Sequence, residues 1–460
     1  MSSKIKQQFY YLLFCYGLFL LIFTAFLKSQ ERDLHIKTRT SAENTQMSDV
    51  ETTPLSEMCA YTSGFTDCEN DCKSSRDSYF FKVYDKNCPL QDITRSCETF
   101  AWLHGYHDIR VTREELNFPL AFSVLMHEHP SQTEQLVRTI YRPNNVYCIH
   151  VDAKASKETF RVMKQLSTCF DNVYMVEARE RMVHASFTHV SAIMKCMRIL
   201  RNTDVNWKYF INLSGSDFPL KTNLEMVRIL KVFNGANDIE TYDFPLLQSW
   251  KFERDFHVLG GSLVEGDSKS PPPYNLKLSK GNPYGLFSRN FVDFIFNDDI
   301  SKSITRWLNT TYSPALSVWA TLVTLPWAPG GYPETVRHLG NTYMSRAYIS
   351  QDDTQPCKGR YLRGMCLLSC EDMPWLKSRP EFFARKFSWT LDRGVLMCLE
   401  KWYRVKAEQT QGVNIDLNFY TKLPHVKYYR NSRIGWKSRL HDDDFLKQEW
   451  LKKRNASRGQ

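Results

Sequence analysis

The sequence of 460 residues lacks the glycine-rich signatures of dinucleotide-binding and P-loop folds. It contains no Gly-x-Gly-x-x-Gly and no Walker loop, the motifs whose backbone N–H groups cradle phosphates. This absence argues against a Rossmann dehydrogenase and against a P-loop enzyme. The charged fraction of 24% is ordinary and the hydrophobic fraction is 42%, so the chain can bury one large core or two smaller ones.

Charge is absent from residues 9–27, a stretch long enough to cross a bilayer as a helix. Two lysines and no acidic residue precede it, so the positive-inside tendency places residues 1–8 in the cytosol and the chain after Lys28 in a lumen or outside the cell. A cleaved signal peptide is the alternative, but no A-x-A-like site follows the run. We therefore expect a short tail, a membrane anchor at 9–27 and a polar stem at 28–57.

Twelve cysteines follow the expected anchor, and an oxidising compartment would make most of them disulfide candidates. Zinc is the competing interpretation for Cys366 and Cys370, although C-x₃-C without a second ligand pair is weak evidence. Sequons at Asn309 and Asn455 predict glycosylation and agree with a secretory route. A third, at Asn212, lies inside a predicted strand, where a glycan would not fit.

The formal net charge of +10 is uneven, because lysine and arginine gather between residues 427 and 458. A lumenal protein does not meet nucleic acid, so no nucleic-acid partner is expected. A solvated basic tail is the simple interpretation, and anionic partners such as sulfated glycans or lipid headgroups are the alternative.

Strand-like and helix-like stretches alternate between residues 120 and 213. The apolar, β-forming runs cover residues 120–126, 145–152, 172–178 and 209–213, and amphipathic segments separate them. This alternation predicts an α/β fold with a mostly parallel sheet and helices on its faces.

Polar residues come directly after three of these strands. His127 follows the first, Asp152 the second and the Ser-Gly-Ser-Asp of residues 214–217 the last. Because ligands bind beyond the C-terminal ends of parallel strands, we expect these residues on one rim of the sheet. Asp152 can accept a hydrogen bond from a ribose hydroxyl or a base N–H; for it and for Asp217 the alternative is a helix cap.

Three longer segments, residues 140–160, 206–230 and 311–322, together resemble the core 2/I-branching β-1,6-N-acetylglucosaminyltransferases, glycosyltransferase family 14. The resemblance extends from about Cys97 to about Lys401. It implies a GT-A-like nucleotide-sugar fold in a type II Golgi membrane protein, with a lumenal domain at 58–417. The basic C-terminal extension at 418–460 has no counterpart in the family. It also implies inverting transfer of GlcNAc from UDP-GlcNAc to a galactose or GalNAc of an acceptor glycan.

The resemblance implies a donor site without metal. Its uridine and ribose contacts correspond to Leu125, Met126, His127, Asp152, Ala153, Lys154 and His184, the last being an aromatic hydroxyl in relatives. The family has no metal-binding Asp-x-Asp and neutralises the UDP leaving group with two cations, which correspond to Arg363 and Lys386. Two positive side chains can offset developing phosphate charge as Mg²⁺ would, so no divalent cofactor is expected; ordinary surface ion pairs are the alternative roles.

The resemblance also implies a pattern of disulfides. The expected pairs are Cys97–Cys169, Cys148–Cys196, Cys357–Cys366 and, for the N-terminal region, Cys59–Cys398. Cys68, Cys72, Cys88 and Cys370 have no family counterpart and could form two further bridges.

The main departure is at the general base. Where the family has Ser-Pro-Asp-Glu and uses the Glu to deprotonate the acceptor hydroxyl, this chain has Ala315 and Leu316, and leucine cannot accept a proton. Carboxylates that could replace it are Asp217, Glu240, Asp352 and Asp353.

The acceptor side departs as well. Glu240 keeps a family carboxylate that can bind sugar hydroxyls, but the basic pair that follows it is replaced around Gln248 and Ser249, and an aromatic platform expected before Cys357 is not evident. Three interpretations stay open: a transferase with a relocated base, a transferase for another sugar such as glucose or xylose, and a catalytically silent lumenal protein that binds UDP-sugar or glycan.

Overall fold

The computed structural model describes residues 89–107, 109–333, 336, 342–409, 415–436 and 443–456. The predicted tail, anchor and stem and the four cysteines before Pro89 lie outside these residues. Among the residues described, no helix is long and apolar enough to cross a membrane.

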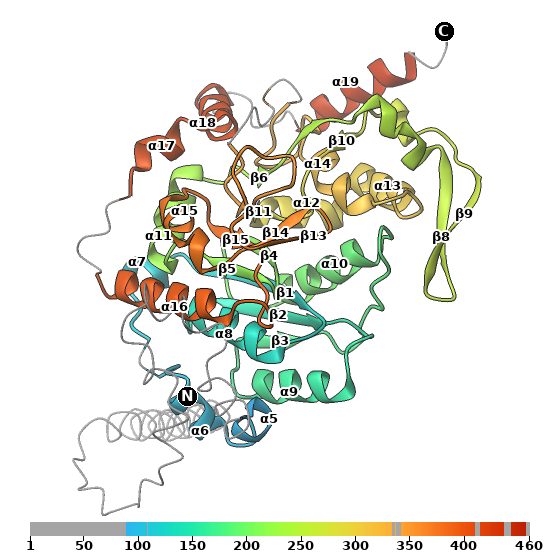
Figure 1. Ribbon diagram of the computed structural model, residues 1–460. Coiled ribbons are helices and arrows are strands. Elements are labelled where there is room, and N and C mark those ends of the chain that lie inside the picture. Colours follow the sequence, from blue (N-terminus) through green and yellow to red (C-terminus); the bar gives the residue numbers. More distant parts are fainter. Residues whose placement is uncertain are drawn as a thin grey trace, which may run out of the picture. The chain divides into compact units, whose positions relative to one another are not determined.

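A six-stranded sheet lies at the centre of the domain, in the order β3-β2-β1-β4-β11-β6 (Figure 1). Its strands are β1 (Leu120–Met126), β2 (Val146–Val151), β3 (Val173–Met175), β4 (Tyr209–Ser214), β6 (Asp238–Ile239) and β11 (Gly285–Ser288). The first four run parallel, and β11 is antiparallel to both of its neighbours. The prediction of a mostly parallel α/β sheet is therefore confirmed, and the antiparallel part was not foreseen.

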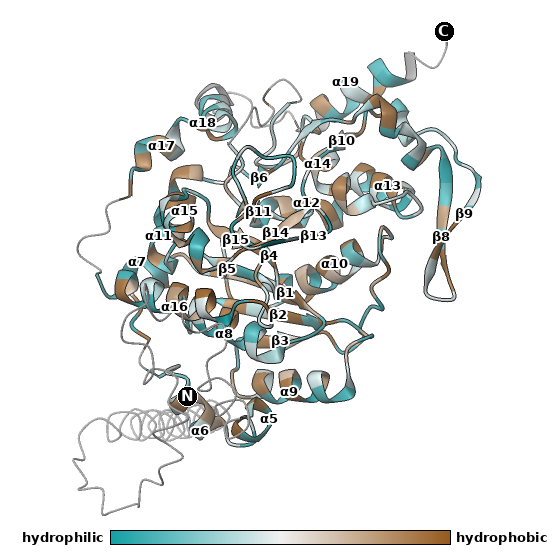
Figure 2. Ribbon diagram, in the orientation of Figure 1, coloured by the Kyte–Doolittle hydropathy of each residue, from teal (hydrophilic) through white to brown (hydrophobic). Residues whose placement is uncertain are grey.

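Helices cover both faces of the sheet (Figure 1). They are α8 (Pro130–Ile140), α9 (Lys157–Thr168), α10 (Thr188–Arg201), α11 (Asn223–Phe233), α12 (Arg289–Asn297), α13 (Asp299–Leu308) and α14 (Val318–Leu322). The first three of them, α8, α9 and α10, connect the parallel strands. Side chains of β1 alternate between two cores: Phe122 and Val124 belong to one, and Ala121 and Leu125 to the other. In Figure 2 the exposed sides of the helices are more hydrophilic than the strands between them, as two-sided burial of a parallel sheet requires.

A second, three-stranded sheet carries the chain back to the end of β4. It has the order β12-β15-β5 and consists of β12 (Arg346–Ala347), β15 (Phe383–Arg385) and β5 (Asp217–Pro219). Next to it are the hairpin of β13 (Arg360–Leu362) and β14 (Met365–Leu367), α15 (Met373–Ser378) and α16 (Arg393–Glu408). β15 pairs with β5, and β5 follows β4 after only two residues. This pairing holds residues 346–387 beside the rim of the central sheet.

Three disulfides join Cys97 to Cys169, Cys148 to Cys196 and Cys357 to Cys366, the pairs that the family resemblance implies. The bridge at Cys366 excludes the zinc interpretation of Cys366 with Cys370, and Cys370 is itself disulfide-bonded. Cys398 is buried; its expected partner Cys59 lies outside the described residues, so that pairing stays a prediction.

The C-terminal extension is packed against the domain. Tyr420 of α17 (Leu417–Thr421) and Val426 of α18 (Pro424–Trp436) are buried in the core on the α11 side. Trp450 of α19 (Asp443–Ala456) makes edge contact with Trp327 at a centroid distance of 5.2 Å. The extension therefore contributes to both cores, which the expectation of a solvated basic tail did not include.

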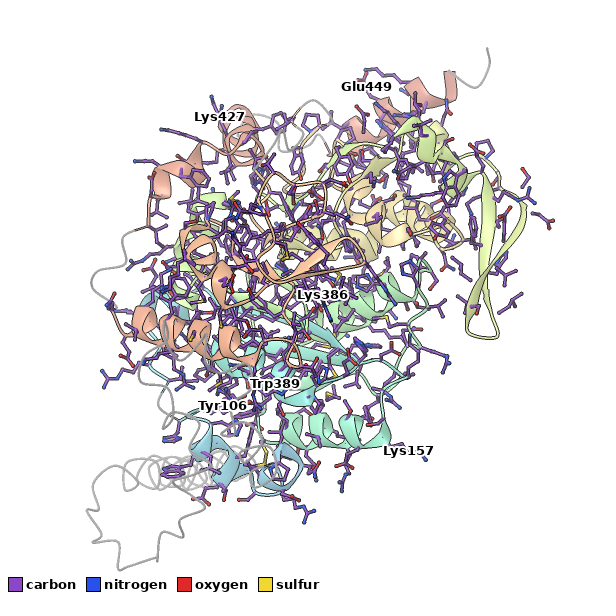
Figure 3. The ribbon with its side chains drawn as sticks, in the orientation of Figure 1. Tyr106, Lys157, Lys386, Trp389, Lys427 and Glu449 are labelled. Atoms are coloured by element: carbon purple, nitrogen blue, oxygen red, sulfur yellow. A yellow bond between two sulfur atoms is a disulfide. The ribbon has the colours of Figure 1, made fainter. Side chains whose placement is uncertain are left out.

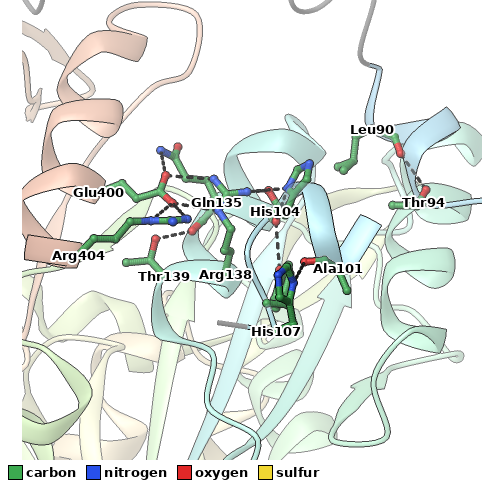
Figure 4. Close-up of polar contacts among 12 residues, drawn as sticks. Leu90, Thr94, Ala101, His104, His107, Gln135, Arg138, Thr139, Glu400 and Arg404 are labelled. Carbon is green, nitrogen blue, oxygen red and sulfur yellow. Dashed lines mark hydrogen bonds and ion pairs between the residues drawn. The ribbon is translucent and has the colours of Figure 1, made fainter. Parts of the chain in front are cut away.

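A buried charge cluster joins α8 to α16 (Figure 4). The guanidinium of Arg138 donates to both carboxylate oxygens of Glu400, at 2.9 and 3.0 Å, and also to Glu134. Gln135 donates to Glu400 at 2.9 Å, and Arg404 donates from the partly exposed side. Burial alone would raise the pKa of Glu400, but Arg138 and then Arg404 outweigh it and hold the pKa at about 2.

Replacing Arg138 with methionine should destabilise the fold by about 3–5 kcal/mol, because it removes the cation that two buried carboxylates, Glu400 and Glu134, share. The matched change Arg404→Met should cost much less, since that side chain is 36% exposed. Chemical denaturation of both variants measures the difference, and equal losses would contradict this account. Because the pKa of Glu400 lies below its unfolded value of about 4.3, the stability that the wild type gains from this group is complete above that pH and is lost as the pH falls towards 2.

Candidate functional site

The rim of the central sheet brings together the ends of β1, β2 and β4. Asp152 follows β2, and its N–H donates to the carbonyl of Met126 at the end of β1 at 2.8 Å. Gly215 follows β4, and its N–H donates to the carbonyl of Leu125 at 2.9 Å. The prediction that these strand ends share one rim is confirmed.

Asp152 organises its loop. It is 4% exposed, and Oδ1 accepts from the N–H groups of Lys154 at 2.8 Å and Met182 at 3.2 Å. The cap of α9 is Ser156, so the alternative of Asp152 as that helix cap is wrong. Lys154 lies 3.6 Å from Asp152 Oδ2, and the N–H of Ala153 donates to Glu180. A buried carboxylate held by backbone donors at a strand end is suited to orient a ribose.

Gly215 has no room for a side chain. A Cβ there would lie 2.7 Å from Thr133 Oγ1 and 3.1 Å from Met126 Cβ, so the loop must approach β1 closely. His127 lies on the same rim but is 65% exposed and forms an ion pair with Glu128 at 3.1 Å when protonated. Because Gly215 has no side chain, the Ser-Gly-Ser-Asp loop exposes its backbone, and no large side chain, at the expected ligand position.

Asp217 is occupied by a structural ion pair. It is 1% exposed, and its Oδ2 accepts from Arg346 Nε at 3.1 Å and from the N–H of Ser214 at 2.9 Å. Arg346 also donates to the carbonyl of Asn212 and is itself fully buried. The cap of α11 is Thr222, so the cap alternative for Asp217 is wrong as well. Enclosed in this way, Asp217 is poorly placed to meet an acceptor hydroxyl.

Arg363 and Lys386 come together at the rim. Arg363 lies in the turn of the β13–β14 hairpin with φ +54°, and Lys386 directly follows β15. The pKa of Lys386 is lowered, first by burial and then by the charges of Arg385 and Arg363, while Glu128 at the end of β1 raises it. Phe387 donates to the carbonyl of Ser216 at 2.9 Å, which fixes Lys386 beside the loop after β4. Lys386 lies near the middle of the domain in Figure 3.

His184 is exposed and lies in the loop between β3 and α10. The carbonyl of the next residue, Ala185, accepts from the N–H of Ser313 at 2.7 Å. Ser313 precedes η4 (Pro314–Leu316). The expected donor residue and the expected base position therefore lie on loops that contact each other.

Glu240 lies on the segment beside Leu316. The carbonyl of Leu316 accepts from the N–H of Gly281 at 2.8 Å, and a Cβ on Gly281 would lie 1.8 Å from the carbonyl oxygen of Glu240. Tyr348 directs its hydroxyl at Glu240 Oε1, 3.5 Å away, and burial together with that carboxylate raises the pKa of Tyr348. Glu240 is half-buried, and its backbone lies against Gly281, which is hydrogen-bonded to Leu316 at the position of the family base.

The other carboxylates considered for the base are less suitable. Asp352 and Asp353 are exposed, and Asp353 accepts from the N–H of Ser350 at 2.5 Å in a turn. Within the part of the chain that the structure describes, no group of three His, Cys, Asp or Glu residues is arranged to hold a metal ion.

Sequence reasoning missed two cations on the acceptor side. Lys251 and Lys280 both donate to Gln248 Oε1, at 2.9 and 3.2 Å. Gln248 thus stands where a basic pair was expected, but two lysines surround it. Lys251 is only three positions from Gln248, so its proximity could have been predicted from the sequence. Lys280 is far away in the sequence and comes close to Gln248 because its strand β10 (Ser279–Lys280) pairs with β7 (Tyr242–Asp243).

A family model and the curated relatives point to the same family. The family model for the Core-2/I-branching enzyme matches residues 120–377. Human beta-1,3-galactosyl-O-glycosyl-glycoprotein beta-1,6-N-acetylglucosaminyltransferase 3 is 36% identical over 344 residues, covering 71% of this chain and 78% of that protein. The Bos taurus enzyme of the same name is 36% identical over 352 residues with the same coverage, and so is the Bovine herpesvirus 4 beta-1,3-galactosyl-O-glycosyl-glycoprotein beta-1,6-N-acetylglucosaminyltransferase.

Proposed function

The chain belongs to the Core-2/I-branching enzyme family and is a glycosyltransferase, and we propose that it transfers a sugar from a UDP-sugar to an O-glycan acceptor with inversion and without a divalent metal. GlcNAc is the proposed sugar, since the relatives are N-acetylglucosaminyltransferases. The observation that carries the metal-independent mechanism is that the hairpin of Arg363 lies against Lys386: Leu368, which follows β14, donates its N–H to the carbonyl of Lys386 at 2.9 Å. After burial and Arg385, the charge of Arg363 also lowers the pKa of Lys386.

The proposed reaction is one in-line displacement. The acceptor oxygen forms a bond to the anomeric carbon as the bond from that carbon to the β-phosphate oxygen breaks, and UDP leaves with the bonding electrons. Arg363 and Lys386 offset the charge on the leaving diphosphate. Asp152 orients the ribose, and the backbone after β4 lies against the donor.

Glu240 is the proposed acceptor of the proton from the attacking hydroxyl. It borders Leu316 through Gly281 and is contacted by Tyr348, and it is less enclosed than Asp217. The same carboxylate accounts for binding of acceptor hydroxyls, since a base must contact the hydroxyl that it deprotonates.

The proposed cellular setting is the Golgi lumen, with residues 9–27 as a type II membrane anchor. The apolar run in the sequence supports the anchor, and the three disulfides support an oxidising compartment.

Release of UDP from a panel of UDP-sugars in the presence of core disaccharide acceptors tests the proposal. We expect release with UDP-GlcNAc; release with UDP-glucose or UDP-xylose instead would change the donor. Tight binding of UDP without release from any donor would identify the silent binder that the leucine at position 316 allows, and would overturn the proposal.

UDP should bind equally well in EDTA and in Mn²⁺, because two side-chain cations at the rim take the place of a metal. Calorimetric titration of the full-length protein in detergent with UDP measures this directly. A difference of more than about tenfold in favour of Mn²⁺, which is about 1.4 kcal/mol, would contradict it.

A further inference from the structure

A strip of polar and aromatic side chains leads away from Glu240 across one edge of the domain. Lys280 lies over the ring of Tyr242, with its Nζ 5.5 Å from the centroid, and Tyr242 is close enough to Glu240 for that carboxylate to raise its pKa, after burial, to about 12. Gln248 then joins Lys280 to Lys251. The strip is thus continuous from the proposed base to η2 (Leu246–Phe252).

The two lysines of this strip carry positive charge that no described carboxylate neutralises. Both are half-buried, and both donate to the same neutral amide oxygen, that of Gln248. The nearby Asp243 forms its ion pair with Lys277 at 2.6 Å. Burial and the charge of Lys280 lower the pKa of Lys251, so the pair is held together against its own repulsion, and a bound anion would relieve it.

An exposed aromatic ring completes the strip. Trp250 is 46% exposed and packs on Tyr312 at a centroid distance of 4.9 Å. Lys251 Nζ is 5.9 Å from the centroid of the Trp250 ring, and the Lys251 carbonyl accepts from the N–H of Tyr312 at 2.8 Å. Since Tyr312 leads directly into the loop of Leu316, the ring is fixed relative to the proposed transfer site.

We infer that the acceptor is an acidic glycan, whose carboxylate or sulfate group binds between Lys251 and Lys280 while one of its sugar rings packs on Trp250. The inference rests on the proposed function for the identity of the neighbouring site and specifies its substrate class. Two ammonium groups that converge on one acceptor atom suit an oxyanion, which accepts from both at once. A neutral sugar hydroxyl would leave most of that charge uncompensated. An exposed indole beside them offers the apolar face that a pyranose ring requires.

The decisive experiment compares three acceptors that share one core disaccharide: neutral, sialylated and sulfated. Binding to the full-length protein in detergent, saturated with UDP, is measured by calorimetry at low salt. We expect at least one acidic acceptor to bind about tenfold more tightly than the neutral one, as charge-assisted hydrogen bonds predict, and the preference to weaken as salt rises. The sialylated and sulfated arms distinguish carboxylate from sulfate.

Lys251→Met and Lys280→Met should each remove most of the preference without changing UDP affinity, which also reports correct folding. Lys251→Arg and Lys280→Arg should retain it. Lys302→Met on α13 removes the same charge from an exposed ion pair with Asp299 and should change nothing. Trp250→Ala should weaken all three acceptors by a similar factor.

Equal binding of neutral and acidic acceptors, or a preference that survives both methionine variants, would overturn the inference. Transfer to neutral acceptors as fast as to acidic ones would overturn the inference and leave the proposed function intact. Lysine-dependent binding of acidic glycans with no UDP release from any donor would retain the inference and overturn the proposed function.

Discussion

Lys386→Ala should reduce turnover by about 10²–10³, the effect of removing one preorganised donor from a developing anion, while weakening UDP binding far less. The reason is that charge on the leaving diphosphate is greatest in the transition state, and Lys386 is half-buried beside the loop after β4. Arg363→Ala should lower turnover in the same direction but less, because Arg363 lies on an exposed hairpin turn. Steady-state kinetics with separate measurement of UDP affinity distinguish the two effects.

Lys386→Arg keeps the charge and should recover part of the lost rate. The pH profile provides a second readout: since burial and the neighbouring arginines lower the pKa of Lys386, turnover should decline on the alkaline side before an ordinary lysine of pKa about 10.4 would lose its proton. Lys377→Ala, an exposed position on α15, is the matched control. Unchanged turnover in Lys386→Ala would remove the leaving-group role.

Local sequence was sufficient for the donor half of this site. The strands that end at Met126, Val151 and Ser214 are continuous apolar runs, and polar residues at their ends mark the rim because parallel strands place their C-termini on one edge. Resemblance then supplied the roles of Arg363 and Lys386, whose proximity no local pattern contains.

Long-range contacts account for what the sequence did not reveal. Asp217 pairs with Arg346, which is 129 positions away, so a carboxylate that looked available after β4 is neutralised by a residue of a strand much later in the chain. Lys280 reaches Gln248 through the pairing of β10 with β7. The antiparallel strand β11 enters the sheet between β4 and β6, although its sequence gives no sign of which neighbour it will choose.

Glu240→Gln should lower turnover by about 10²–10⁴, the usual effect of losing a general base, with little change in UDP affinity. Asp217→Asn should behave differently, because it breaks the buried pair with Arg346 and should reduce stability before it affects the chemistry. If turnover survives Glu240→Gln with the wild-type pH profile, the proton goes to another group and the proposed mechanism is wrong.

Leu316→Glu completes the test, because it restores a carboxylate at the position of the family base. As a single substitution, Leu316→Glu should lower turnover for two reasons. A second carboxylate near Glu240 raises the pKa of one of the two carboxylates, and it places a charge in a site formed around an apolar side chain. In the Glu240→Gln background the same change should restore part of the lost rate, whereas Leu316→Gln, of similar size but unable to take a proton, should restore none. Opposite effects of one substitution in two backgrounds are expected only if positions 240 and 316 can deliver a base to the same hydroxyl, as their contact through Gly281 suggests. A gain from Leu316→Glu in the wild type would instead mean that Glu240 binds the acceptor without deprotonating it.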